Sequence, residues 1–243
     1  MYLSCLLIDV GTDPDRPRPG RLWLRNLYHV HQRLCMAFPS ASRKTDDADF
    51  LRPFKSEDFE PHVHVVRGPD AGFLFGIDPQ AGGRVMVVVR SAAKPDWEYA
   101  FHNAAYLLAA PPEVKSFDPC FAKEQHLRFR LVANPTRKID TKSGPDGRRR
   151  NGKRVAVPPA QFEEWLARRA DAAGFCIAEG STALQPAYLY VNKTRSVSGQ
   201  RLRSVRYDGI LTVTDPIRFR EALVRGIGPG KAFGFGLLSV ARA

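Results

Sequence analysis

Residues 215–240 have the sequence DPIRFREALVRGIGPGKAFGFGLLSV, and this stretch indicates how the second half of the chain folds. Asp215 is a residue type that caps helix N-termini well, and Pro216 suits the first helical position. Apolar residues follow at helical spacing, a glycine-rich connection comes next, and Phe233–Val240 predicts a final strand. The stretch therefore predicts a helix that leads through a tight connection into the last strand of a sheet.

The residues before this stretch predict the rest of a βαββαβ unit. Every second residue of 127–131 is apolar and the residues between are arginines, which indicates a strand with a basic face that includes Arg130. Pro158-Pro159 then introduces a helical apolar stripe over Ala160–Ala173. Two further strands are expected at residues 187–193 and 202–213.

The first half of the chain repeats this order. Tyr2–Val10 predicts a strand, and a proline-rich turn separates it from a helix over Leu27–Phe38 that Asn26 caps. Further strands are expected at residues 62–66, 73–77, 84–90 and 113–117, with a short helix opening at Pro95-Asp96-Trp97. We therefore predict an α+β protein of two tandem ferredoxin-like domains, residues 1–118 and 119–243.

The composition narrows the classes of function. The chain has 243 residues with 37 Lys and Arg against 25 Asp and Glu, which gives a formal net charge of +12. Such an excess favours a polyanionic partner, because neutralised phosphates release counterions. No apolar run approaches the roughly 20 residues that span a bilayer, so no membrane span is expected. Single cysteines at positions 5, 35, 120 and 176 argue against a disulfide or zinc framework and favour a reducing cytoplasm.

Five glycines surround a lysine in residues 226–236, GIGPGKAFGFG. Glycine loses more backbone entropy on ordering than other residues, so this density needs a physical reason. One reason is close approach to a phosphate chain, in which backbone N–H groups at Gly228 and Gly230 and the charge of Lys231 bind the phosphates. The other is a tight turn into a strand. A Walker loop is excluded, because the glycine spacing is too short and Ala232 stands where Ser or Thr must hold magnesium.

Matches to one protein family extend along the whole chain. The C-terminal segment has two Gly-x-Gly units separated by five residues that include a base. The other matching segments are Met1–Ser4, Tyr28–His31, Ala37–Pro39, Phe73–Phe75, Pro95–Trp97, Phe129–Thr136 and Gly152–Val155. Together these motifs resemble the RAMP superfamily of CRISPR RNA-binding proteins, and within it the CasE family of endoribonucleases, which cleave CRISPR repeats in type I-E Cascade.

The resemblance implies a catalytic pair on the first helix. In that family a Tyr-x-x-His pair is catalytic, and it corresponds to Tyr28 and His31 here. Residues three apart share a helix face, so a phenol and an imidazole can converge on one phosphate. Histidine also suits the proton transfers that accompany attack by an RNA 2′-OH near neutral pH. His29 competes for the role, but on a helix it points about 200° away from His31.

Two further observations concern charge and metal. Some members of the family carry a lysine five residues after the histidine, where this chain has Met36. We therefore expect Lys231 or Arg33 to stabilise the charge of the transition state instead.

His62 and His64 share one face of a predicted strand, but no third ligand accompanies them. We predict no metal and no cofactor.

Two basic clusters provide candidate RNA contacts besides Arg130, Lys231 and the glycines. Members of the family use the hairpin between the middle strands of the second domain to enter the groove of the RNA stem. The basic residues of this hairpin are Lys193, Arg195, Arg201, Arg203 and Arg206. A Gly-, Lys- and Arg-rich loop contains Arg137, Lys138, Lys142, Arg148, Arg149, Arg150, Lys153 and Arg154. For both clusters the alternative is a solvated charged surface.

The resemblance implies a metal-independent endoribonuclease that binds the CRISPR repeat stem-loop and cleaves at the 3′ base of the stem. The products would be a 2′,3′-cyclic phosphate and a 5′-OH, and the enzyme would remain on the mature crRNA beside the other Cascade subunits. The alternative is a catalytically silent RNA-binding subunit of the same superfamily. A tandem RRM without a CRISPR link is less favoured, because residues 127–131 lack the expected set of stacking aromatics.

Overall fold

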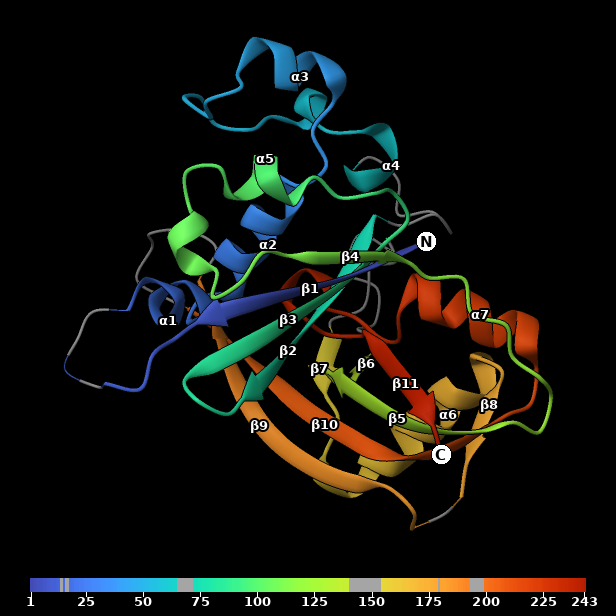
Figure 1. The fold of residues 1–243 in the computed structure, drawn as a ribbon. Coiled ribbons are helices and arrows are strands. Elements are labelled where there is room, and N and C mark those ends of the chain that lie inside the picture. The colour runs from blue at the N-terminus through green and yellow to red at the C-terminus, as the bar shows by residue number, and fades with distance from the viewer. Residues whose placement is uncertain (14, 16–17, 65–71, 140–153, 179, 193–198) are drawn as a thin grey trace, which may run out of the picture.

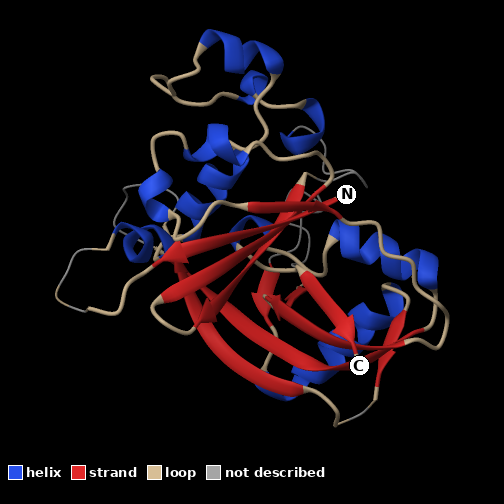
Figure 2. Ribbon diagram, in the orientation of Figure 1, coloured by secondary structure: helices blue, strands red, loops and turns tan. Residues whose placement is uncertain are grey.

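The computed structural model describes the chain except for residues 14, 16–17, 65–71, 140–153, 179 and 193–198. Two antiparallel sheets face each other, and the helices that cover them lie mainly on their outer sides (Figure 1; Figure 2). The first sheet is built from residues 2–116 and the second from residues 126–242. In the described part of the chain no helix is long and apolar enough to cross a membrane.

The first sheet has the strand order β2-β3-β1-β4. Its strands are β1 (Tyr2–Asp9), β2 (Phe73–Gln80), β3 (Arg84–Ser91) and β4 (Glu113–Ser116). β1 pairs antiparallel with β3, from Tyr2 opposite Ser91 to Asp9 opposite Arg84. Helices separate β1 from β2 and β3 from β4. This order and these crossovers are those of a ferredoxin-like domain.

The helices of the first domain include both predicted ones. They are α1 (Pro19–Leu24), α2 (Leu27–Cys35), α3 (Ala41–Asp46), α4 (Pro61–His64) and α5 (Trp97–Phe101), with 3-10 turns η1 (Ser56–Asp58) and η2 (Ala105–Leu107). The predicted helices are α2 and α5. The Asn26 side chain caps α2 and accepts a hydrogen bond from the Tyr28 backbone N–H at 3.1 Å. α2 ends at Cys35, and residues up to Phe38 continue in tighter turns.

The second sheet has the order β11-β5-β10-β8, with β9 also paired to β10. Its strands are β5 (His126–Ala133), β8 (Phe175–Ile177), β9 (Ala183–Val191), β10 (Gln200–Val213) and β11 (Leu238–Arg242). The remaining elements are the hairpin β6 (Thr136–Lys138) and β7 (Arg154–Ala156), helices α6 (Phe162–Ala172) and α7 (Pro216–Arg225), and 3-10 turns η3 (Pro159–Gln161) and η4 (Lys231–Phe233). Because β8 and β9 pair with successive parts of β10, they share the place of one strand in a second ferredoxin-like unit.

Two predicted strands differ from the structure. The strand expected at residues 62–66 is wrong: Pro61–His64 form α4, and residues 65 and 66 lie outside the described part. Proline has a preset φ that favours the first turn of a helix. The last strand begins at Leu238 rather than Phe233, because Gly230 and Gly234 have φ values of +83° and +74° and enclose η4. The sequence also did not predict α1, α3, β8 or the β6–β7 hairpin.

The glycine-rich turn, residues 226–236, connects α7 to β11 and packs against the first domain. Phe233 and Phe235 are buried in the hydrophobic core of the first domain, among residues of α2 and the first sheet. A backbone hydrogen bond from Ile227 N–H to the Gly236 carbonyl at 2.9 Å closes the turn. The domain boundary between residues 118 and 119 stays a prediction. The hydrophobic packing does not follow this boundary, because Phe233 and Phe235 come from the C-terminal part of the chain and lie in the core of the first domain.

We predict that Phe235→Ala destabilises the protein by about 3–5 kcal/mol, because Phe235 is 0% exposed and its removal leaves a cavity in a core that both domains share. Equilibrium unfolding in urea measures the change in the free energy of unfolding. Ile217→Ala on α7, where the side chain is 75% exposed, is the control and should change it by less than about 0.5 kcal/mol. Equal effects of the two substitutions would contradict the packing described here.

Candidate functional site

α2 carries both residues of the predicted catalytic pair. Leu27, Val30 and Leu34 are buried and turn one side of this helix toward the core of the first domain. Tyr28 and His31 are half-buried, and Tyr28 packs against the edge of the same core. The spacing of three places them on one side of the helix, as the sequence predicts. The fold is compatible with their catalytic role, which stays a prediction.

The imidazole of His31 lies against aromatic rings of β2. Its ring centroid is 5.3 Å from that of Phe73 and 6.5 Å from that of Phe75, with the latter pair stacked. On its own helix, Nε2 of His31 lies 3.6 Å from Sγ of Cys35. Burial raises the pKa of the Cys35 thiol to about 12. The imidazole is thus held by two phenyl rings and a neutral thiol.

The glycine-rich turn brings Lys231 to this helix. Lys231 begins η4, and η4 packs against both α2 and β2. Burial, with a smaller contribution from the charge of Arg225, lowers the pKa of Lys231 below its ordinary value. A half-buried lysine next to α2 supplies positive charge in surroundings where water screens it less than at the surface. The structure therefore brings together the elements that carry His31 and Lys231.

The backbone conformation and the packing of the turn both explain its glycines. The φ values of Gly226, Gly228, Gly230, Gly234 and Gly236 are all positive. A Cβ atom at Gly228 would lie 3.1 Å from the Trp165 ring, and one at Gly230 would lie 2.8 Å from the ring of Phe235. Of the two reasons considered for the glycine density, the tight turn is observed. Phosphate binding by Gly228 and Gly230 stays a prediction.

The other groups considered near the pair lie elsewhere. Arg33 donates hydrogen bonds to the Ala100 carbonyl and to Asn103 Oδ1, both at 3.0 Å, and so points toward α5. Met36 packs against the core of the first domain. His29 is exposed, and its carbonyl accepts a bond from the indole of Trp23. Of the two predicted substitutes for a lysine at position 36, Lys231 is therefore the better placed.

The predicted basic hairpin is formed by β9 and β10, and its basic side chains lie on both faces. Arg201 and Arg203 are on the face that bears Tyr188: the Arg201 guanidinium lies 3.8 Å from the Tyr188 ring centroid, and Arg203 donates to its hydroxyl at 3.0 Å. Arg206 is an odd number of residues away, so it lies on the opposite face, where it bonds Asp208. Lys193 and Arg195 lie outside the described residues.

Two tyrosines of this hairpin were missed by the sequence interpretation. Tyr188 and Tyr190 are 45% and 65% exposed and pair with Arg203 and Arg201 across the strands. Hydrogen bonds from Arg201 and then Arg203 lower the pKa of Tyr188. The signal was available: tyrosines alternating with apolar residues in a strand fall on one face.

The second basic cluster is described only at its ends. Arg137, Lys138 and Arg154 are exposed on the β6–β7 hairpin, and Nη1 of Arg154 lies 3.4 Å from the Thr136 hydroxyl. The positions of this cluster from Lys142 to Lys153 lie outside the described residues.

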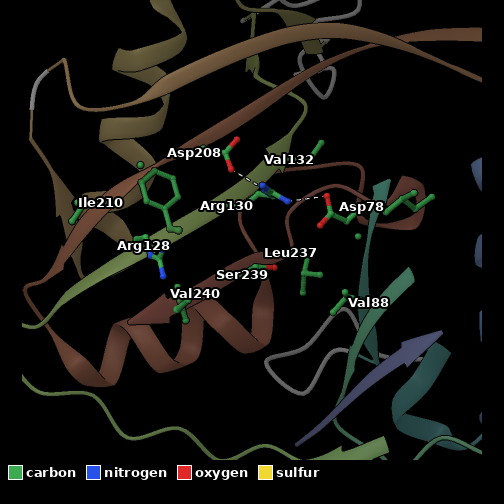
Figure 3. Close-up of a pocket in the computed structure, with 16 residues that line it drawn as sticks. Asp78, Val88, Arg128, Arg130, Val132, Asp208, Ile210, Leu237, Ser239 and Val240 are labelled. Carbon is green, nitrogen blue, oxygen red and sulfur yellow. Dashed lines mark hydrogen bonds and ion pairs between the residues drawn. The ribbon is translucent and has the colours of Figure 1, made fainter. Parts of the chain in front are cut away.

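Arg130 lies in a cleft between the two sheets, which has a volume of about 650 Å³ (Figure 3). It donates to Asp78 of β2 at 2.8 Å and to Asp208 of β10 at 2.7 Å. Burial opposes the ionisation of Asp208, but the hydrogen bonds from Arg206 and Arg130 hold its pKa below the ordinary value. Arg130, predicted to bind RNA, thus joins the two domains through its ion pair with Asp78. Arg206, predicted in the same role, pairs with Asp208 within β10.

Among the described residues, no group of three or more His, Cys, Asp and Glu side chains is placed to hold a metal ion. His62 and His64 lie on α4 rather than on the strand that was predicted for them, and their side chains are outside the described set.

Comparison with known proteins connects this arrangement to a family. The family model for "CRISPR associated protein" matches residues 1–242. The endoribonuclease Cse3 of Thermus thermophilus is 37% identical over 99% of this chain and 100% of its own length. The Cascade subunit CasE of Escherichia coli K12 is 27% identical over 99% of each chain. A solved structure of Cse3 bound to a 19-nucleotide RNA superposes with a TM-score of 0.69, at 30% identity over 99% of this chain and 100% of that one.

The match extends over both domains, so it includes α2, the glycine-rich turn and the β9–β10 hairpin together. The chain belongs to the family of CRISPR-associated proteins that includes these Cse3 and CasE relatives.

Proposed function

We propose that the chain is an endoribonuclease that binds the stem-loop of CRISPR repeat RNA and cleaves it at the 3′ base of the stem. The observation that carries the proposal is the position of His31: it lies on a capped helix against the turn that bears Lys231, in a chain whose full-length relative is named an endoribonuclease. The RNA-bound structure of Cse3 supports RNA as the ligand.

The residues present suit cleavage by the RNA's own 2′-OH. That reaction requires one proton to leave the attacking hydroxyl and one to reach the departing 5′ oxygen, which gives a 2′,3′-cyclic phosphate and a 5′-OH. His31 transfers a proton in this scheme, because imidazole changes its charge near neutral pH. Tyr28 orients the ribose or phosphate, and Lys231 stabilises the charge that develops on the phosphate oxygens.

The proposed function includes binding to crRNA and to other Cascade subunits. One relative is named a Cascade subunit, and we propose that this chain likewise remains on the mature crRNA within a complex of Cascade subunits. We propose the cytoplasm as its location, because all four cysteines are unpaired thiols.

We predict that His31→Ala lowers the cleavage rate by about 10²–10⁴-fold, the usual contribution of proton transfer by a positioned side chain. Repeat stem-loop affinity should stay within a few-fold of that of the wild type, because His31 acts on the reaction rather than on the stem. Single-turnover cleavage in excess EDTA, with analysis of the product ends, measures the rate and the chemistry.

His29→Ala is the matched control, since His29 is exposed on the other side of α2 and should leave the rate unchanged. A wild-type rate in His31→Ala would refute its catalytic role. Tight binding without cleavage by the wild type would instead identify a silent RNA-binding subunit, and cleavage abolished by EDTA would show a metal requirement.

We predict that Arg201→Gln combined with Arg203→Gln reduces the salt dependence of repeat binding. Each lost phosphate contact should lower the slope of log affinity against log salt concentration by roughly 0.7–0.9. Titration of labelled stem-loop at several KCl concentrations measures this slope. Arg168→Gln on α6, with a side chain 62% exposed, is the control for a general loss of charge. A slope unchanged by the double substitution would remove these arginines from the interface.

A further inference from the structure

His31 has a neighbour one turn later on its own helix. Sγ of Cys35 and Nε2 of His31 are 3.6 Å apart, a hydrogen-bonding distance for sulfur. The spacing of four residues places both side chains on the same side of α2. Cys35 is 4% exposed, so the sulfur side of this contact is shielded from water. Neither the family comparison nor the proposed mechanism uses Cys35.

The chemistry of the two groups sets the direction of the hydrogen bond. A buried thiol whose pKa is raised to about 12 keeps its hydrogen at neutral pH, so it is able to donate. An imidazole nitrogen accepts a hydrogen bond only when it carries no proton. Phe73 and Phe75, the rings against the imidazole, offer no carboxylate that would favour its charged form.

We propose that Cys35 is a positioning residue for His31, whose S–H group donates to Nε2 and selects the neutral imidazole tautomer with its proton on Nδ1. The bond also fixes the ring against β2. The consequence for catalysis rests on the proposed function, whereas the tautomer is a property of the protein without RNA. Donation to the neutral ring lowers the pKa of His31 relative to the same site without a donor.

The described titratable groups near His31 lie on α2 and on elements packed against it. On α2 itself they are Tyr28 and Cys35, and η4, which packs against α2, carries Lys231. β2 contributes the two phenyl rings. α1 and α5 contact α2 through His29 and Arg33, which lie on the opposite side of the helix from His31.

The tautomer is tested directly in RNA-free wild-type protein. In ¹⁵N NMR of histidine-labelled protein, with His31→Ala used to assign the signal, His31 should show a protonated Nδ1 and an unprotonated Nε2 above its pKa. A pH titration should give a higher His31 pKa in Cys35→Ala than in the wild type or in Cys35→Ser, which retains a donor. A wild-type ring protonated on Nε2, or identical pKa values in all three proteins, would overturn the proposal.

The reaction provides the second test. Whichever proton His31 moves, the limb of the pH–rate profile that reports it should shift to higher pH in Cys35→Ala, by about 0.5–1 unit for the loss of one hydrogen bond. Cys35→Ser should return the limb toward the wild-type position. An equal loss of rate at every pH, without a shift, would show that Cys35 only fills space. If the wild type does not cleave, the proposed function fails, and the NMR result still decides the role of Cys35.

Discussion

The contact between Gly234 and Phe75 determines where the candidate site forms. A Cβ atom at position 234 would lie 3.1 Å from the Phe75 ring, and the same ring stacks on His31. Phe75 therefore contacts both the glycine-rich turn of the second domain and α2 of the first, the helix that carries the candidate catalytic pair. Because a φ of +74° at Gly234 is also strained for other residues, glycine satisfies two demands at this position.

This arrangement gives His31 and Lys231 related surroundings. Both are half-buried, and both are positioned by side chains that are themselves buried: Phe75 behind the imidazole and Phe233 two residues after the lysine. Charges in such a place interact more strongly than at the surface, and burial favours the neutral form of each base. The lowered pKa of Lys231 is one result, and the neutral His31 that we infer is another. The site therefore depends on a core that neither domain completes alone.

The sequence predicted the parts of this arrangement that depend on local order. Asn26 caps α2 and Tyr28 and His31 share a side, because capping and helical spacing act within a few residues. The two ferredoxin-like sheets followed from the order of the elements. The destination of the glycine-rich turn could not be predicted, because it depends on contacts with Phe75 in the other domain. The His-x-His pattern was misassigned to a strand because Pro61, just before it, starts a helical turn.

The sequence predicted least well which arginines are free to bind an anion. This depends on which face of a strand lies next to an aspartate side chain in the folded protein. The arginines of β10 alternate between the two faces. Arg130 pairs with Asp78 and Asp208, and Arg206 also pairs with Asp208, so two arginines and two aspartates offset one another in this network. Arg201 and Arg203 instead meet tyrosines, which leave their charge uncompensated. The positive charge of Arg130 and Arg206 is therefore offset within the protein. An anionic ligand gains more from Arg201 and Arg203 on the outer face of the hairpin.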